Sequence, residues 1–382
     1  MIQISDKSQC TGCTACQQVC AHRAINMEYD SEGHSYPMVD TQICIDCGLC
    51  EKVCPIQHKE RIPQDVNLDN LKVYAAYNKD NEVRERSTSG GIFTSLSQYI
   101  LNRGGIVYAA RFNDKYHIIH SSFNKIEDID PYRGSKYAQS ELNDTFKSIK
   151  SELTSRVVLF VGTPCQVAGL KSFLRKEYDN LYTCDFICMG ISSSKMWDEY
   201  LVDYWKGKNI ERIFFKDKRG GWHQWKMLIK HQEGEYLSSG MEDPFFYSYL
   251  THLSYRPSCL ECPFRTCRRL SDFTIADCWG IDKVNPSFDD NKGCTTLILQ
   301  SRKAELAFSQ IKEDLESKLY NIDYVKKYNP YIVKQIQSHP DREKFYTLYK
   351  KSGFKTAASI YCRLRNKQSI IKRIINKLRI FA

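Results

Sequence analysis

The chain has 382 residues, of which 42% are hydrophobic and 26% charged. This composition excludes long disordered regions and allows two or three domains of roughly 100–200 residues each. The net charge is +10, but nine of the 55 basic residues and none of the 45 acidic ones lie in the last 32 residues, so the nearly neutral remainder excludes a general binder of nucleic acid.

Cysteine is the unusual residue, because the chain has 17 of them, an odd number. The N-terminus has no basic head followed by an apolar stretch, so we expect no signal peptide and a cytoplasmic protein. No apolar run approaches the ~20 residues that span a bilayer. Without export, clustered cysteines are more often metal ligands than disulfide partners. The cysteines therefore predict metal centres.

Two runs of four cysteines, each spaced C-x2-C-x2-C-x3-C, lie in the first 55 residues. The first run is Cys10, Cys13, Cys16 and Cys20, and the second, 34 residues later, is Cys44, Cys47, Cys50 and Cys54. This duplication is the bacterial ferredoxin pattern for two 4Fe-4S clusters, in which the fourth cysteine of each run binds the other cluster. We therefore expect one cluster on Cys10, Cys13, Cys16 and Cys54, and another on Cys20, Cys44, Cys47 and Cys50.

Small residues between these cysteines let the loop wrap a cubane, and the fourth cysteine is expected to begin a short helix. The alternative is a pair of zinc sites, but zinc-binding runs usually supply two ligands each. Residues 25–40 alternate and turn at Ser31-Glu32-Gly33, which predicts a hairpin between the runs. Residues 1–55 are thus expected to form an α+β ferredoxin-like module with two 4Fe-4S clusters.

Residues 56–70 are polar and without clear period, which indicates a linker. Beyond them, strand and helix patterns alternate. We expect strands over 73–77, 106–110, 157–162 and 181–188, and helices over 89–102, 166–174, 194–205 and 304–319. The alternation predicts an α/β domain with a largely parallel or mixed sheet.

Three segments of this domain carry residues suited to chemistry. Arg86–Gly91 stands where a loop enters a helix, which suits a phosphate, although hydroxyl residues cap helices generally. Gly162–Gln166 follows a buried strand, where α/β sheets usually bind ligands. The pair Cys259 and Cys262 leaves zinc, iron–sulfur and simple burial open. Three isolated cysteines are expected to be buried: Cys184, Cys294 and Cys362.

Seven sequence blocks follow one another between about residues 71 and 300. They are RSTSGGIF at 86–93, RGSKYAQS at 133–140, VGTPCQVAGL at 161–170, DFICMG at 185–190, KDKRGGW at 216–222, RPSCLECPF at 256–264 and SDFTIADCWGI at 271–281. In this order the blocks resemble the beta subunits of coenzyme F-420 hydrogenases and dehydrogenases and related bacterial reductases. An N-terminal ferredoxin module is a common fusion within that family.

The resemblance implies an α/β domain with a mixed sheet that binds FAD and carries a third 4Fe-4S cluster. The implied flavin contacts are Ser87, Thr88, Ser89, Gly90, Gly91, Lys136, Tyr137, Gln139, Gly162, Thr163 and Pro164. The implied ligands of the third cluster are Cys165, Cys188, Cys259 and Cys262. Met189 and Cys278 depart from the family pattern, which usually has histidine and an aromatic residue there, so Cys267 and Cys278 are alternative ligands.

The function implied by the resemblance is that of an iron–sulfur flavoprotein oxidoreductase. Electrons from a low-potential donor such as ferredoxin, or from a reductase, would reach FAD through the clusters and reduce a small organic substrate or a deazaflavin, or flow in reverse. The alternatives are an electron-relay subunit of a larger redox complex and a metal-stabilised binding protein. No catalytic residue is assigned, because a structural role is the commoner fate of histidines such as His117, His120, His223 and His252.

The C-terminal tail carries the basic excess. Between residues 369 and 381 apolar residues recur at helical spacing, at Ile370, Ile371, Ile374, Ile375 and Leu378. Such a helix suits an anionic membrane surface or an acidic partner, although docking on the protein's own body is favoured. The expected parts are a ferredoxin-type domain at 1–55, a linker at 56–70, an FAD and 4Fe-4S domain at 71–345 and the tail at 346–382.

Overall fold

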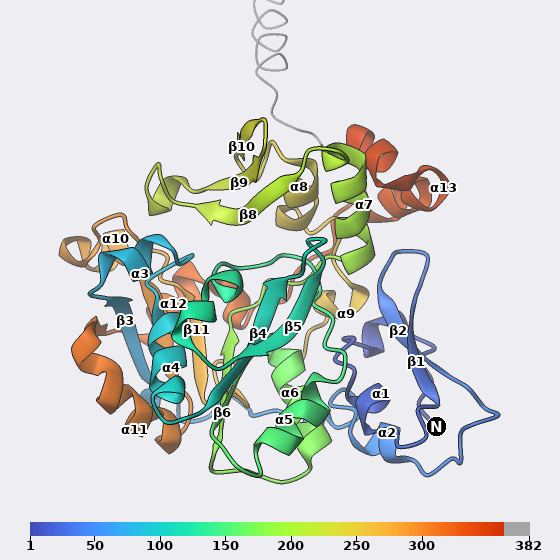
Figure 1. Ribbon diagram of the computed structural model, residues 1–382, viewed down its shortest axis with the longest axis horizontal. Helices are drawn as coiled ribbons and strands as arrows, with labels where there is room; N and C mark the ends of the chain where they lie inside the picture. Colours follow the sequence, from blue (N-terminus) through green and yellow to red (C-terminus); the bar gives the residue numbers. More distant parts are fainter. Residues whose placement is uncertain (363–382) are drawn as a thin grey trace, which may run out of the picture.

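The computed structural model describes residues 1–362. The basic helix expected over residues 369–381 lies outside them. Figure 1 shows an N-terminal module, in blue, beside helices of a larger domain that contains one large and one small sheet. No helix among the described residues combines the length and the apolar character that crossing a bilayer would require.

The N-terminal module is built around the predicted hairpin. Strands β1 (Ile25–Tyr29) and β2 (Ser35–Val39) pair antiparallel, with Ile25 opposite Val39. The module also has two short helices, α1 (Ala15–Val19) and α2 (Leu49–Lys52). The hairpin expected between the two cysteine runs is therefore confirmed.

The fourth cysteine of each run does not begin a helix, so that expectation was wrong. Cys20 caps the C-terminus of α1, and Cys54 follows α2. The turn into each helix is made earlier, because Thr14 and Gly48 adopt left-handed conformations with φ of 60° and 70°. Glycine takes up this conformation without steric cost. Each helix therefore starts within the cysteine loop and delivers the fourth cysteine at its end.

The larger domain contains an eight-stranded sheet with the order β13-β3-β12-β11-β7-β6-β4-β5. Its strands are β3 (Lys72–Asn78), β4 (Ile106–Phe112), β5 (Ile118–Phe123), β6 (Val158–Val161), β7 (Leu181–Phe186), β11 (Phe273–Asp277), β12 (Thr295–Leu299) and β13 (Leu315–Leu319). β11, β7, β6 and β4 pair in parallel, and the remaining pairs are antiparallel. The mixed sheet expected for this domain is confirmed.

Five strands of this sheet end at the same edge. β12 is antiparallel to both β3 and β11, so β3 runs in the same direction as the four parallel strands. The residues that follow β3, β4, β6, β7 and β11 therefore lie along the same edge of the sheet, which we call the carboxyl edge. In α/β sheets this is where ligands usually bind.

Helices cover both faces of the large sheet because its strands alternate in the face that they present. In β6, Val158 and Phe160 pack with α5 and α6, whereas Leu159 packs with α4 and α11. The helices of this part are α3 (Asn81–Glu85), α4 (Ile92–Leu101), α5 (Thr145–Glu152), α6 (Pro164–Leu174), α9 (Pro257–Leu260), α10 (Ile281–Val284), α11 (Arg302–Ile311) and α12 (Ile322–Tyr328).

Two of the expected helices differ from the structure. The helix expected over residues 304–319 ends at Ile311, and Leu315–Leu319 form β13, which pairs antiparallel with β3 at the edge of the sheet. The free edge of β3 offers hydrogen bonds that a local helical pattern cannot reveal. The helix expected from residue 89 begins at Ile92, because Gly91 has a φ of 88°.

The smaller sheet lies above the larger one in Figure 1 and has the order β10-β9-β8. Its elements and their helices are β8 (Ile210–Asp217), β9 (Lys226–His231), β10 (Gly234–Ser238), α7 (Ser194–Trp205), α8 (Pro244–Leu250) and α13 (Arg342–Tyr361). They share an aromatic core that includes Trp197, Phe245 and Phe345. The boundary expected after residue 345 falls inside α13, which Gly353 interrupts with a φ of 76°.

Candidate metal centres

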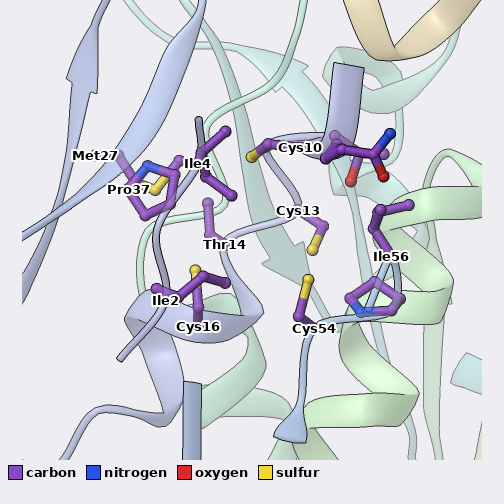
Figure 2. Close-up of a pocket in the computed structure, with 14 residues that line it drawn as sticks. Ile2, Ile4, Cys10, Cys13, Thr14, Cys16, Met27, Pro37, Cys54 and Ile56 are labelled. Carbon is purple, nitrogen blue, oxygen red and sulfur yellow. The ribbon is translucent and has the colours of Figure 1, made fainter. Parts of the chain in front are cut away.

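Four cysteines from two distant segments line one cavity in the N-terminal module. They are Cys10, Cys13, Cys16 and Cys54. Figure 2 shows the sulfurs of Cys13 and Cys54 facing each other across this cavity. The rest of the lining is mostly apolar, with Ile2, Ile4, Met27, Pro37 and Ile56 among its members. The structure thus brings together the set that the spacing predicts for one cluster, which we call the first site.

N–H groups point at the sulfurs of the first site. The backbone N–H of Ala15 bonds to Cys13, and Arg256 Nη2 donates to Cys10 Sγ at 3.5 Å. Burial, together with the neighbouring Cys54 and Cys10, raises the pKa of the Cys13 thiol to about 12. A buried thiolate there therefore needs a metal as its partner, and hydrogen bonds to the sulfurs tune such a centre.

The second predicted set, Cys20, Cys44, Cys47 and Cys50, lies closer to the surface. Cys50 is buried with Ile2 and Ile25, and Cys20 packs beside them, whereas Cys47 is exposed. Three backbone amides donate to its sulfurs: Ile2 N to Cys50 at 3.3 Å, Ala24 N to Cys20 at 3.4 Å and Asp46 N to Cys44 at 3.4 Å. We call this set the second site.

The donor chemistry of both sites suits a cubane. Within residues 1–362, no three cysteine, histidine or acidic side chains converge closely enough to hold a single metal ion. A 4Fe-4S cluster makes a different demand, because four thiolates bind four separate irons. The cavity of the first site offers four cysteines and no histidine or carboxylate, and the second set also consists of four cysteines, so the donors present fit this group.

A third set of cysteines comes together at the carboxyl edge. Cys165 is the second residue of α6, Cys188 follows β7, and Cys259 and Cys262 lie in and just after α9. Burial raises the pKa of the Cys165 thiol, and the charges of Cys262, Cys188 and Cys259 raise it further, so the four sulfurs are neighbours. This group, which we call the third site, is the set implied by the resemblance.

The two alternative ligands lie elsewhere. Cys267 is buried among Leu71, Val73 and Ile298, and its backbone N–H donates to Asp65 Oδ1 at 2.7 Å. Cys278 hydrogen-bonds to Cys294 in another apolar group. Cys184, Cys294 and Cys362 are all buried, as the sequence analysis predicts. Cys267 and Cys278 therefore lie outside the third site.

The first group of predicted flavin contacts, Ser87–Gly91, follows β3 and α3 at the carboxyl edge. Ser89 Oγ donates to the carbonyl of Cys294 at 2.5 Å, and Gly90 N donates to Thr295 Oγ1 at 2.9 Å. A Cβ on Gly90 would lie 2.5 Å from the carbonyl oxygen of Ala76. The loop is therefore packed tightly onto β3 and β12, and only glycine fits at its fourth position.

The other predicted flavin contacts fall into two groups. Thr163 caps α6, and its Oγ1 lies 3.1 Å from Cys165 Sγ, so Gly162–Pro164 adjoins the third site. Burial lowers the pKa of Lys136 to about 7, and its Nζ donates to three backbone carbonyls of residues 131–133. Tyr137 is half-buried beside Lys216. Gln139 instead points at the module, where its Nε2 donates to Thr11 O and Gly12 O at 3.2 and 3.0 Å.

Two basic residues near these sites were missed by the sequence analysis. Lys216 Nζ lies 2.5 Å from Asp277 Oδ2, and both side chains are largely buried at the carboxyl edge. Burial opposes the charge of Lys216, but Asp277 and Tyr137 together outweigh burial and raise the pKa of the lysine. Arg256 is fully buried and reaches Cys10. Lys216 begins the block KDKRGGW and Arg256 begins the block RPSCLECPF, so the basic residue at the start of each block was the available signal.

The four histidines named in the sequence analysis have structural partners. His117 Nδ1 lies 2.5 Å from Asp198 Oδ1, and His223 Nε2 lies 2.6 Å from Asp289 Oδ2. His120 is held by Val161 O at 3.0 Å and Ser140 Oγ at 2.8 Å, and burial lowers its pKa to about 4. Burial also lowers the pKa of His252. These contacts favour the structural role.

Comparison with known families covers most of the chain. The family model "Coenzyme F420 hydrogenase/dehydrogenase, beta subunit N-term" matches residues 73–147, and the corresponding C-terminus model matches residues 155–324. The model "4Fe-4S dicluster domain" matches residues 9–57. The three matches follow the order of the module and the larger domain.

Individual relatives are distant. The beta subunit of a coenzyme F420 hydrogenase of Methanococcus voltae is 22% identical over 254 residues, 65% of this chain and 83% of that protein. A subunit of the F(420)H(2) dehydrogenase of Methanosarcina mazei is 25% identical over 166 residues, 41% of this chain and 46% of that protein. An uncharacterized protein of Methanocaldococcus jannaschii is 23% identical over 205 residues, 47% of this chain and 56% of that protein. The chain thus spans about half the length of the last two.

One solved structure is also similar. A chain of the F420-reducing [NiFe] hydrogenase complex from Methanosarcina barkeri aligns with a TM-score of 0.45 and 17% identity, over 80% of this chain and 98% of that chain. The family assignment depends on the sequence matches. By these, the chain belongs to the coenzyme F420 hydrogenase/dehydrogenase beta-subunit family and carries an N-terminal 4Fe-4S dicluster domain.

Proposed function

We propose that this protein is an iron–sulfur flavoprotein oxidoreductase. It passes electrons between a low-potential donor such as ferredoxin and a small organic substrate or deazaflavin, through three 4Fe-4S clusters and FAD. The observation that carries the proposal is the contact between the first and third sites. Cys54 of the first site and Cys165 and Cys262 of the third site pack against one apolar group, made of Ile56, Ile62, Ala168 and Phe264.

Helix α6 supplies a second contact between these sites. Its N-terminus carries Cys165, and one turn later Gly169 abuts the module, where an added Cβ would lie 3.0 Å from Cys13 Cβ and Sγ. Residues four apart lie on the same face of a helix. One rigid element therefore holds a cysteine of the third site at a set distance from a cysteine of the first.

The second site is placed to exchange electrons with a partner protein. Cys20 and Cys50 of the second site share an apolar group with Cys16 and Cys54 of the first site, so the two sites adjoin. Cys47 is exposed, and Ile45 beside it is 63% exposed. The order from the surface inward is therefore second site, first site and third site, and the third site itself lies at the carboxyl edge.

The carboxyl edge offers groups that fit a flavin. Asp277 Oδ1 is buried and has no hydrogen-bond partner among the described residues, so it is free to accept a hydrogen bond from a ligand. Lys216 and Tyr137 lie beside it, and the Ser87–Gly91 loop enters α4 at the same edge. Bound there, FAD would supply the exchange between single electrons and hydride pairs. Lys216 would hold a proton next to the reacting atoms.

A second candidate is a relay subunit without a substrate of its own. It is favoured by the names of two relatives, which are subunits of a hydrogenase and a dehydrogenase. Turnover by the isolated chain distinguishes the two candidates: reduction of a deazaflavin by the pure protein with an artificial donor supports the enzyme, and flavin reduction without any turnover supports the relay.

The proposal is tested on anaerobically purified full-length protein. We expect non-covalently bound flavin, and we expect reduced ferredoxin to bleach its absorbance. Cys165→Ser should keep the module clusters reducible but leave the flavin oxidised, because the path from the first site is interrupted. Protein without flavin, or bleaching at an unchanged rate in Cys165→Ser, would contradict the proposal.

A further inference from the structure

Arg256 is a residue of the larger domain whose side chain is inserted into the module. It precedes α9 and is 0% exposed. Its Nε donates to Cys10 O at 2.7 Å, and its Nη2 donates to Ser35 O at 2.8 Å and to Cys10 Sγ at 3.5 Å. Nη1 donates to Gln139 Oε1 at 3.2 Å, and the guanidinium lies 4.2 Å from the centre of the Tyr36 ring.

The charge of Arg256 has no acidic partner in the described part of the chain. Its hydrogen-bond acceptors are two backbone carbonyls, one side-chain amide and one cysteine sulfur, and it takes part in none of the ion pairs within residues 1–362. Buried charges in proteins are normally paired, because removing an ion from water is costly. Arg342, at the same interface, follows this rule through its pair with Glu32. Arg256 therefore needs a counter-ion that is not a carboxylate.

We infer that the anionic 4Fe-4S cluster of the first site is the counter-ion of Arg256, and that Arg256 is a positioning residue that raises the reduction potential of this cluster. The inference rests on the proposed iron–sulfur function. Reduction adds negative charge to the cluster, and a fixed cation with an N–H donor to a ligand sulfur stabilises that added charge.

The position of Arg256 makes its effect selective. Its guanidinium contacts Cys10 of the first site, where Nη2 donates to the sulfur at 3.5 Å. None of its polar contacts is with a cysteine of the second site. The cation therefore lies against the first site and makes electron arrival there more favourable than at the second site.

The test is a potentiometric titration, followed by electron paramagnetic resonance, of the full-length protein with its clusters. We expect Arg256→Gln to make the reduction of one cluster at least tenfold less favourable, which lowers its potential by about 59 mV for a one-electron couple. Arg256→Lys should show a smaller shift, because it keeps the charge and loses the fork of donors. Arg342→Gln removes a cation from the same interface without touching a sulfur and should leave all potentials unchanged.

An unchanged potential in Arg256→Gln with full iron content would overturn the inference. If Arg256→Gln loses the iron of one cluster, retention of that iron by Arg256→Lys supports the counter-ion role, and equal loss in both variants contradicts it. Equal shifts in Arg256→Gln and Arg342→Gln would also contradict it, since the effect would then belong to the interface as a whole. Wild-type protein without three clusters would instead refute the proposed function, before Arg256 is tested.

Discussion

The module and the third site both offer four cysteines for each proposed cluster, but the chain brings these cysteines together in different ways. The first and second sites are built from two short runs, Cys10–Cys20 and Cys44–Cys54, joined by one hairpin. The third site draws Cys165, Cys188 and the Cys259–Cys262 pair from three segments. The module's sites therefore depend on loop geometry, whereas the third site exists only when β6 and β7 end side by side.

The interface between the module and the larger domain combines apolar packing with charged side chains. Loop residues of the module pack on α6, so Cys13 and Val53 belong to the same apolar group as Val167 and Leu170. Arg256 and Arg342 cross the same boundary from the other side. The module is therefore held by packing and charge together, and each can be changed separately.

The largest effect is expected at the third site. Cys259→Ser should lose about four of about twelve irons per chain, because one of three cubanes loses a ligand. The eight module cysteines should keep their iron. Iron and sulfide analysis measures this, with Cys267→Ser as the matched control. Loss of iron from Cys267→Ser with none from Cys259→Ser would mean that the ligand set is wrong.

The next effect tests the contact between the regions. Gly169→Leu should slow electron transfer from the module to the third site about tenfold or more, because its side chain would push Cys13 away and overpack the interface by roughly 1–3 kcal/mol. Stopped-flow reduction of the full-length protein measures the rate. Lys171→Leu, on the more exposed side of α6, is the control. An unchanged rate in Gly169→Leu with full iron content would show that α6 does not set the distance.

A smaller effect is expected on how the stability of the larger domain depends on pH. The pKa of His120 falls from 6.5 to about 4 on folding because the ring is buried. The unfolded chain then binds a proton that the folded chain does not, so stability is lost as the pH falls from 6.5 towards 4, by about 3 kcal/mol in all. His120→Gln should flatten the decrease in the melting temperature between pH 7 and pH 5. An equally steep decrease in the variant would contradict this.

The smallest effect is expected from the basic tail. Phe354, Ala357 and Ala358 pack in the aromatic core, so the chain should be truncated after Cys362 and not earlier. We expect the truncated protein to keep its iron, and both forms to remain unbound in flotation with anionic vesicles at low salt. Flotation of the full chain alone would show that the tail contacts membranes, with each basic residue adding about 1 kcal/mol.

Much of the fold was predictable where the signal is local. The hairpin of β1 and β2, strands β3, β4, β6 and β7 and helix α7 follow from alternation or helical periodicity over a few residues. Residues 315–319 were predicted as helix, because their pairing with β3 depends on a strand more than two hundred residues earlier. The pattern within a segment does not report which sheet edge is free.

The candidate sites show the same difference between what a local pattern predicts and what only long-range contacts decide. The sequence by itself determined which cysteines are proposed as ligands in the module, because a cubane needs four thiolates and closely spaced cysteines supply them. Only the tertiary structure decided that Cys267 and Cys278 pack away from the third site, that Gln139 points at the module and that Lys216 pairs with Asp277. It also placed Arg256 against Cys10. These are contacts between residues far apart in the chain, and their geometry follows from the packing of the sheet and its helices.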